Sequence, residues 1–206
     1  MNTILQLNSS IYNGKGESSR LATEFVAQLR AGNPGAKVVV RELAKDPIPH
    51  LDEARFAAFL ARPEARTPEQ ARVVGESDAL IAELKAADAI VIALPMYNFG
   101  VPSQFKAWVD HVARAGVTFK YTDKGAVGLV TGKKAWVFAT RGGLYAGTAA
   151  DTQTAYVRQF LAFIGITDVE FVYAEGLAMG EAPRAKGLSG ARSALLRLAG
   201  ELPLAA

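Results

Sequence analysis

Three loops of this sequence gather the residue types that bind small molecules, namely glycine, serine, asparagine and aromatic residues. They run from Asn8 to Ser19, from Pro95 to Ser103 and from Thr140 to Gly147, and each follows a stretch that predicts a β-strand. In parallel sheets, ligands lie beyond the carboxyl ends of the strands. We therefore expect the three loops to converge on one ligand.

The first loop joins a strand to a helix and has the composition of an anion site. Hydroxyl groups and free amides at a helix start can hold a phosphate, because the N–H groups and the helix dipole face the anion. The loop contains neither G-x-G-x-x-G nor G-x-x-x-x-G-K-[ST], so it supports neither a dinucleotide fingerprint nor a Walker site. Ser18 could equally act only as a helix cap.

The second loop follows the most apolar strand. Two prolines and one glycine predict a rigid loop, and its Met, Tyr, Asn and Phe side chains offer an apolar plate with one amide. A flat heteroaromatic ring would fit such a plate. These side chains could also be ordinary core residues. However, a buried Asn98 between two aromatic residues would need hydrogen-bond partners, which favours a ligand.

The third loop places Gly142 and Gly143 directly after a strand. Adjacent glycines let backbone amides approach a ligand closely and accept positive φ angles. A simple turn would explain them equally well. We expect the neighbouring Arg141 to point into solvent or to form a salt bridge rather than to contact a ligand.

The elements that position these loops follow from the hydrophobic pattern. Strands are expected at residues 4–8, 37–43, 89–95, 135–140 and 169–174. The third of them shows no polar alternation, which is typical of a strand covered on both faces. Helices are expected at residues 18–31, 67–87, from Ser103 up to Gly116, before Gly165, and at 190–202.

Local signals refine this plan. Thr67 to Gln70 has the pattern of a capping box with proline in the first turn. The connection from Leu43 to Asp88 is too long for a bare loop, so we expect an extra short helix near residues 52–60. Repeated strand–helix alternation predicts one α/β domain over residues 1–206, a doubly wound parallel sheet of five strands with helices on both faces.

The composition excludes several classes of protein. Half of the 206 residues are apolar and the formal net charge is +3, so the chain is not predominantly disordered. Without cysteine it has neither a disulfide nor a thiol nucleophile, and any redox chemistry needs a cofactor. The basic residues are scattered, which argues against nucleic acid as a partner. No stretch resembles a secretory leader or a membrane span, so we expect a cytoplasmic protein without a membrane partner.

The two histidines, His50 and His111, are too far apart to suggest a metal site. His111 follows Asp110 on an expected helix. We interpret it as a helix histidine with satisfied hydrogen bonds rather than as part of a proton relay.

Taken together, the motifs resemble those of the FMN-dependent NADH:quinone oxidoreductases that also reduce azo dyes, the FMN-dependent NADH-azoreductases. The similarity covers nearly the whole chain. Its most specific parts are Pro95–Phe99, Val101–Lys106, Trp108 with Asp110, Gly116–Phe119, Thr140–Gly143 and Phe163–Thr167.

This resemblance implies a flavodoxin-like fold and a homodimer with one FMN per subunit. It assigns the phosphate end of FMN to Ser10, Gly16, Glu17 and Ser18, and the isoalloxazine to Met96, Tyr97, Asn98, Phe99, Thr140, Arg141, Gly142 and Gly143. The family often has serine at the first position of the phosphate stretch, whereas Gly16 offers only its amide.

The same resemblance implies NADH as the electron donor, two-electron reduction of quinones and cleavage of aromatic azo compounds to amines. Donor and acceptor would share one cleft, which predicts ping-pong kinetics. Because the flavin carries the hydride, we name no catalytic side chain and no metal ligand. Phe119, Tyr121 and Tyr145 are candidates to line the substrate site, although Phe119 and Tyr121 could instead belong to a dimer contact.

Two other functions stay open. A flavodoxin-type electron carrier would bind FMN and dock protein partners, but such carriers are typically acidic and have the pattern T-x-T-G-x-T, which this mildly basic chain lacks. An NAD(P)H:FMN reductase would release the flavin as a substrate.

Overall fold

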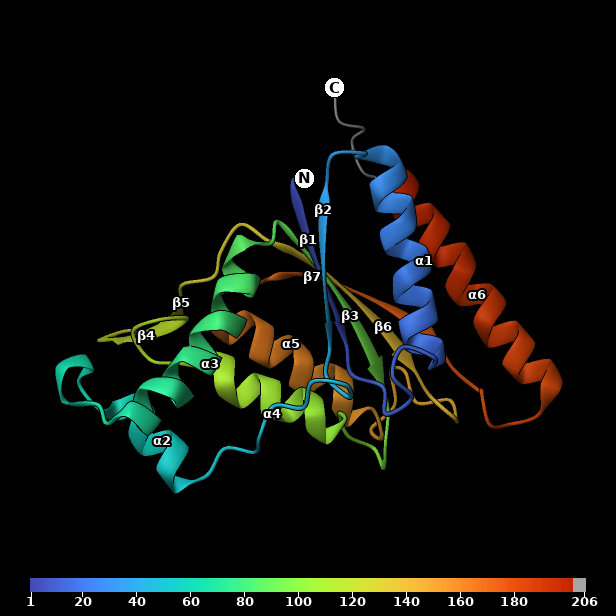
Figure 1. Cartoon of the computed structure of the whole chain (residues 1–206). Coiled ribbons are helices and arrows are strands. Elements are labelled where there is room, and N and C mark those ends of the chain that lie inside the picture. The colour runs from blue at the N-terminus through green and yellow to red at the C-terminus, as the bar shows by residue number, and fades with distance from the viewer. Residues whose placement is uncertain (202–206) are drawn as a thin grey trace.

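Five parallel strands form one twisted sheet in the computed structural model, which describes residues 1–201 (Figure 1). The strands are β1 (Thr3–Asn8), β2 (Lys37–Glu42), β3 (Ala89–Pro95), β6 (Lys134–Thr140) and β7 (Asp168–Ala174), in the order β2-β1-β3-β6-β7. All four pairings are parallel, which confirms the predicted sheet. The direction of winding reverses between β1 and β3, so the crevice for a ligand opens beyond the ends of these two strands.

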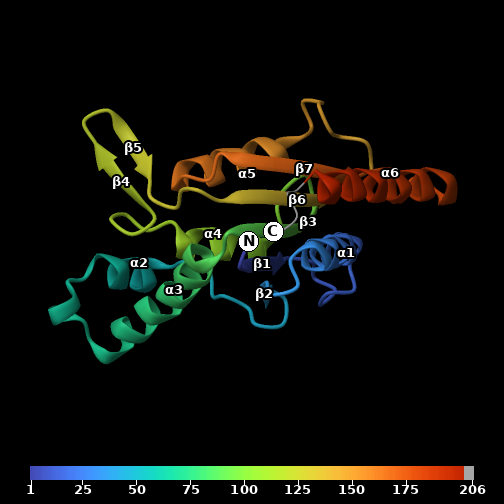
Figure 2. The same cartoon turned by 90° about the horizontal axis from the view of Figure 1, so that it is seen from above.

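Helices cover both faces of the sheet (Figures 1 and 2). The helices α1 (Glu17–Gly32) and α6 (Glu181–Gly200) lie on one face, and α3 (Pro68–Ala86), α4 (Ser103–Val112) and α5 (Thr152–Ile164) lie on the other. The helix α2 (Glu53–Leu60) packs on α3 and is followed by a short 3-10 helix, Pro63–Ala65. This arrangement confirms the expected doubly wound fold.

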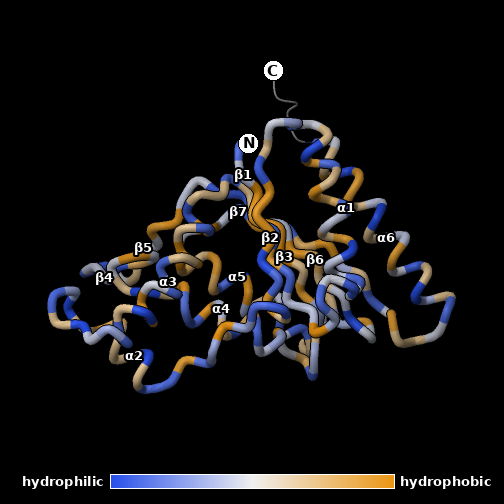
Figure 3. The backbone as a smooth tube through the Cα atoms, in the orientation of Figure 1, coloured by the Kyte–Doolittle hydropathy of each residue, from blue (hydrophilic) through white to orange (hydrophobic). Residues whose placement is uncertain are grey.

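The central strand β3 separates two apolar cores. All of its residues are buried, as its unbroken apolar run predicts, and successive side chains point to opposite faces. Ile90 and Ile92 pack with α3, α4 and α5, whereas Val91 packs with α1 and α6. Figure 3 shows the resulting apolar band along the strands. Burial of this band determines where the strands end and therefore where the loops after them begin.

The capping box at Thr67 and the extra short helix both form as the sequence predicts. The Thr67 hydroxyl accepts from the amide of Gln70 at 3.2 Å, and the Gln70 side chain accepts from the amide of Thr67 at 3.0 Å. The extra short helix is α2, where the Asp52 carboxylate accepts from the amide of Arg55 at 2.8 Å. Local caps of this kind need no tertiary partner.

The last helix begins earlier than predicted, at Glu181 instead of Gly190. Pro183 and Gly187 obscure its start in the sequence, since both are poor helix formers. Pro183 lies in the first turn, where its missing N–H breaks no helical hydrogen bond. A Cβ at Gly187 would lie 2.1 Å from the carbonyl oxygen of Glu175, so the close approach of α6 to the residue after β7 requires glycine there. The predicted end at Leu202 lies outside the described residues.

A small antiparallel hairpin, β4 (Phe119–Thr122) and β5 (Gly125–Gly128), extends from the body of the molecule between α4 and β6 (Figure 2). A Cβ at Gly128 would lie 2.1 Å from the amide nitrogen of Gly165, so the end of the hairpin packs directly on the end of α5.

His111 fixes α2 to the body. Its ring lies edge-on to Phe59 of α2, with 5.8 Å between the ring centres, and its Nδ1 lies 2.9 Å from the carbonyl oxygen of Ala107. The other ring nitrogen, Nε2, is buried without a partner, so the expectation of a fully satisfied histidine was wrong. Burial lowers the pKa of His111 below its ordinary value of 6.5.

This burial predicts a pH dependence of stability. Well above pH 6.5 the His111 ring is neutral in both the folded and the unfolded state. As the pH falls below 6.5, the unfolded chain takes up a proton that the folded chain resists, so the free energy of unfolding decreases until the lowered folded pKa is reached. Urea denaturation of His111→Gln should show a shallower loss of stability over this range.

The matched control is His50→Gln, since His50 is exposed and the chain has only 2 histidines. It should keep the pH dependence of the unchanged protein. The assignment would be wrong if His111→Gln retained the full slope, or if both variants lost it equally.

Candidate functional site

A cleft of about 360 Å³ opens at the carboxyl ends of β1, β3, β6 and β7. Four loops contribute to it, and only three of them were expected. The residues that line it are Ser10, Tyr12, Gly16, Glu17, Ser18, Pro95, Met96, Tyr97, Thr140, Arg141, Gly142, Leu177 and Ala178. The structure thus brings together most of the residues that the sequence assigned to a cofactor.

The start of α1 is suited to an anion. Gly16 is its N-cap, and no side chain caps the first turn, so the first amides of the helix are free to bind a ligand. The hydroxyl groups of Ser18 and Ser19 are buried without a partner. Ser18 lies within the helix, so its interpretation as a helix cap was wrong.

Glycine is also required at position 16 because the loop brings this residue close to Ser10. A Cβ at this position would lie 2.3 Å from the hydroxyl oxygen of Ser10. A serine at position 16 would therefore collide with Ser10. This contact gives a physical reason for glycine at a position where the family often has serine. The side chain of Glu17 turns away to Arg184 of α6, at 2.5 Å, and leaves its backbone amide in the first turn.

The second loop reverses in a tight turn. The backbone amides of Tyr97 and Gly100 donate to each other's carbonyl oxygens at 3.1 and 3.0 Å, and the two residues between them have positive φ angles, 49° at Asn98 and 64° at Phe99. These are the features of a type I′ turn. Backbone strain at non-glycine residues persists only where neighbouring groups enforce it.

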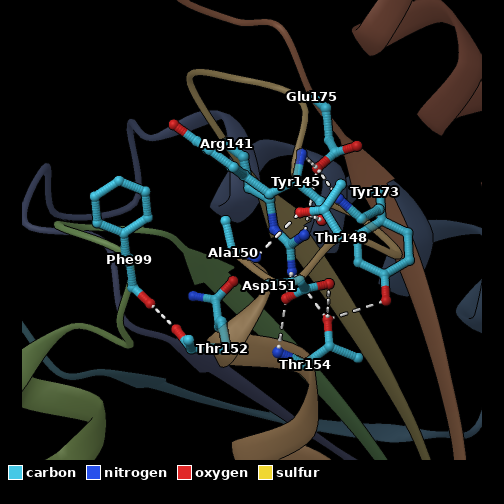
Figure 4. Close-up of polar contacts among 12 residues, drawn as sticks. Phe99, Arg141, Tyr145, Thr148, Ala150, Asp151, Thr152, Thr154, Tyr173 and Glu175 are labelled. Carbon is cyan, nitrogen blue, oxygen red and sulfur yellow. Dashed lines mark hydrogen bonds and ion pairs between the residues drawn. The ribbon is translucent and has the colours of Figure 1, made fainter.

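Residues of α5 enforce this turn. The buried Gln153 donates from Nε2 to the carbonyl oxygen of Pro95 at 2.9 Å. Thr152 donates to the carbonyl oxygen of Phe99 (Figure 4). Gln153 was not singled out in the sequence because nothing near it in the chain marks it as a loop anchor. Asn98 is exposed at the tip of the turn, so the expectation of a buried asparagine was wrong. Asn98 and Phe99 lie outside the set of lining residues.

Arg141 is enclosed at the end of β6. Its guanidinium pairs with Asp151 at 2.7 Å and Glu175 at 3.3 Å and lies 4.8 Å from the centre of the Tyr173 ring (Figure 4). The salt bridge was expected, but solvation was not found, since none of the side chain is exposed. Burial raises the pKa of Asp151, but the hydrogen bonds from Arg141 and Thr154 outweigh burial and the pKa is lowered.

The third loop is joined to a fourth one that the sequence analysis missed. The Glu175 carboxylate accepts from the amides of Tyr145 and Ala146, both at 2.8 Å. The amide of Ala178 donates to the carbonyl oxygen of Gly142 at 3.0 Å, and that of Gly176 donates to Gly143 at 3.0 Å. This fourth loop, residues 175–180 between β7 and α6, supplies Leu177 and Ala178 to the cleft. Its only signal was its place after the last strand, at the same edge of the sheet.

The remaining candidates lie apart from the lining residues. Tyr145 is edge-on to Phe99, with 5.6 Å between ring centres, and a Cβ at Gly143 would lie 2.8 Å from the Tyr145 ring. Phe119 is buried against Phe163, whereas Tyr121 is 74% exposed on the hairpin. Neither residue of the hairpin lines the cleft of this chain.

Residues 1–201 contain no group of three or more His, Cys, Asp or Glu side chains arranged to hold a metal ion. Over the same range, no helix has the length and apolar character to cross a membrane.

Comparison with known proteins decides the family. A family model described as the flavodoxin-like fold matches residues 2–198. The chain belongs to this family. A curated relative, FMN-dependent NADH:quinone oxidoreductase 6 of Burkholderia lata, is 54% identical over 195 residues, which is 95% of this chain and 98% of the relative. The FMN-dependent NADH:quinone oxidoreductase of Alcanivorax borkumensis is 55% identical over 193 residues, covering 94% of this chain and 98% of the relative.

Solved structures of flavodoxin-like proteins agree with this assignment. The azoreductase of Bacillus anthracis superposes with a TM-score of 0.89 at 25% identity and covers 98% of this chain and 100% of its own. An FMN-dependent NADH-azoreductase of Bacillus anthracis in complex with FMN superposes with a TM-score of 0.85 at 26% identity, over 97% of this chain and 100% of its own.

The enclosed guanidinium predicts a large effect of Arg141→Met on stability. The variant keeps an apolar stem but leaves the carboxylates of Asp151 and Glu175 buried without their cation. The free energy of unfolding, measured by urea denaturation at neutral pH, should fall by about 3–5 kcal/mol.

Arg197→Met is the matched control, because Arg197 forms an exposed ion pair with Glu201. It should lower the free energy of unfolding by about 1 kcal/mol or less. Equal losses in the two variants would contradict the role given to Arg141.

Proposed function

We propose that this chain is an FMN-dependent NADH:quinone oxidoreductase that also cleaves aromatic azo compounds reductively to amines. The observation that carries the proposal is the cleft at the β1–β3 crevice, where free helix amides and the unpartnered Ser18 hydroxyl lie next to the loop of Met96 and Tyr97. The names of relatives that are more than half identical over nearly the whole chain support it.

The residues present fit FMN. A phosphate needs several donors, and the first turn of α1 offers uncapped amides together with the buried, unpartnered hydroxyl of Ser18. A planar ring needs a flat wall and close backbone, which Met96, Tyr97 and Gly142 can provide. The cleft volume of about 360 Å³ lies within the range of small-molecule sites.

Within this proposal each loop has one task. Ser10, Ser18 and the amides of Gly16 and Glu17 bind the phosphate. The second and third loops bind the isoalloxazine, through Met96, Tyr97, Thr140, Arg141 and Gly142, which line the cleft. Asn98, Phe99 and Gly143, which adjoin these residues in the chain, are assigned to the outer part of the same site. Arg141 contributes its backbone, because its guanidinium is occupied by two carboxylates.

Bound FMN would supply two-electron chemistry, accepting hydride from NADH and reducing the quinone or azo compound. The protein positions the reactants and excludes water, so no side chain is assigned a proton-transfer step. Donor and acceptor would use the same cleft in turn, and ping-pong kinetics are expected. Tyr145, beside Phe99, is the candidate to contact the planar acceptor.

A homodimer completes the proposal. Tyr121, Val127 and Leu129 are exposed apolar residues on or next to the hairpin, which extends from the body of the molecule (Figure 2). A second copy that covers them could bring Phe119 and Tyr121 to the neighbouring substrate site. We also propose a cytoplasmic location.

Spectra and turnover of the purified protein test the function. The protein should retain a yellow flavin through dialysis and oxidise many equivalents of NADH with benzoquinone. Loss of the flavin on dialysis would favour an NAD(P)H:FMN reductase, and near-stoichiometric oxidation would favour an electron carrier. A protein that stays colourless with added FMN would overturn all three functions.

Ser10→Ala tests the phosphate site. It removes one hydrogen bond to a charged group, so the binding free energy of FMN should weaken by about 1.5–3 kcal/mol, which is roughly a tenfold or larger increase in Kd. Fluorescence titration of the flavin-free protein with FMN measures this. Ser189→Ala, on the exposed surface of α6, is the control and should leave Kd unchanged. An unchanged Kd for Ser10→Ala would place the phosphate elsewhere.

A further inference from the structure

A second cavity lies on the other side of the loop that carries Met96 and Tyr97. Its volume is about 510 Å³. Three segments form it: the chain before α2, the loop before α4 together with the first turn of α4, and the first two turns of α5. The residues that line it are His50, Gly100, Val101, Ser103, Lys106, Thr152, Gln153 and Tyr156.

Two polar atoms on the α5 wall of this cavity have no hydrogen-bond partner. They are Oε1 of Gln153 and the hydroxyl of Tyr156, and both atoms are buried. The two residues are three positions apart on one helix, so their side chains are neighbours on the same face. Buried polar atoms normally have partners, and two orphaned ones on a single cavity wall point to a ligand.

The charges in the cavity are already compensated. Lys106 donates to both carboxylate oxygens of Asp110, at 2.6 and 2.7 Å. Burial, and to a lesser degree the Asp110 carboxylate, raise the pKa of Tyr156 to about 12, so its hydroxyl stays protonated at neutral pH. A neutral ligand therefore fits better than an anion.

The two unpartnered atoms need different hydrogen-bond partners, namely a donor for Gln153 and an acceptor for Tyr156. The amide oxygen of Gln153 can only accept, whereas the Tyr156 hydroxyl can donate. A phenolic hydroxyl satisfies both at once, because it donates its proton and accepts on its oxygen. A quinone carbonyl or an ether oxygen could accept from Tyr156 but would leave Gln153 unpaired.

We propose that this cavity is a second ligand site, which binds a neutral aromatic ring through a phenolic hydroxyl held between Gln153 and Tyr156. Resting on the proposed function, the natural ligand class is the hydroquinone formed from a quinone. The site therefore prefers the reduced over the oxidised ring.

Gln153 connects this site with the cleft. Its Nε2 donates to the carbonyl oxygen of Pro95, which lines the cleft, and also to that of Gly100, which lines the cavity. A hydroquinone bound to Oε1 of Gln153 therefore lies next to Nε2, the atom of the same side chain that holds the loop of Met96 and Tyr97.

Calorimetric titration of the FMN-loaded protein with 1-naphthol tests the site, with 1-methoxynaphthalene as a probe that has the same ring but no hydroxyl proton. The unchanged protein should bind 1-naphthol about tenfold more tightly than the ether. Tyr156→Phe should bind both probes about tenfold more weakly, since both accept from its hydroxyl, and should keep the preference, which rests on donation to Gln153. Without ligand, the same variant should be more heat-stable, since it removes an unpaired buried hydroxyl.

Tyr173→Phe is the matched control. The Tyr173 hydroxyl lies 3.1 Å from Thr154 of α5, but Tyr173 is outside the residues that line the cavity. It should bind 1-naphthol as the unchanged protein does. Equal affinity for naphthol and ether, or unchanged naphthol binding by Tyr156→Phe, would overturn the proposal. So would a loss of dimer mass in Tyr156→Phe without a change in naphthol binding, since the hydroxyl would then serve a contact between copies.

Turnover with NADH and benzoquinone, measured on the same samples, separates this proposal from the proposed function. Normal turnover with no preference for naphthol would refute the second site alone. Absent turnover with intact naphthol preference would refute the proposed function and leave the cavity as a phenol site.

Discussion

The loops around the cleft depend on one buried charge. The Arg141 guanidinium is fully enclosed and pairs with Asp151 at the start of α5 and with Glu175 directly after β7. Glu175 in turn holds the amides of the third loop. A buried cation is stable only when its partners surround it. The third loop, the fourth loop and the first turn of α5 therefore adopt their positions together.

The helix α5 extends this constraint to the second loop and to both cavities. Gln153, two positions after Asp151, holds the carbonyl oxygens of Pro95 and Gly100, and Thr152 holds that of Phe99. These bonds maintain a turn with two non-glycine residues at positive φ. The loop is thus a rigid wall with a cleft on one side and a cavity on the other. A change at α5 affects both sides.

Particular residues show how far the sequence could predict the site. Ser10, Gly16 and Met96 line the cleft as expected, because strand–helix alternation already determines which loops share an edge of the sheet. Asn98 is exposed although it was predicted to be buried, because the direction in which a turn faces decides its burial. The chain reverses at Tyr97, and the tip of that turn is exposed to solvent. Leu177 was missed because its loop carries no distinctive chemistry.

By itself, the sequence determined the alternation of strands and helices, the cap at Thr67, the short helix near residues 52–60, the need for a cofactor in redox chemistry, and the family. Only the tertiary structure decided that Arg141 is enclosed and that Gln153 and Tyr156 keep unpaired oxygens. Periodicity and capping act between residues a few positions apart, so they can be seen in the chain. The partners of Arg141 lie 10 and 34 positions away and contact it only once the strands and helices have assembled.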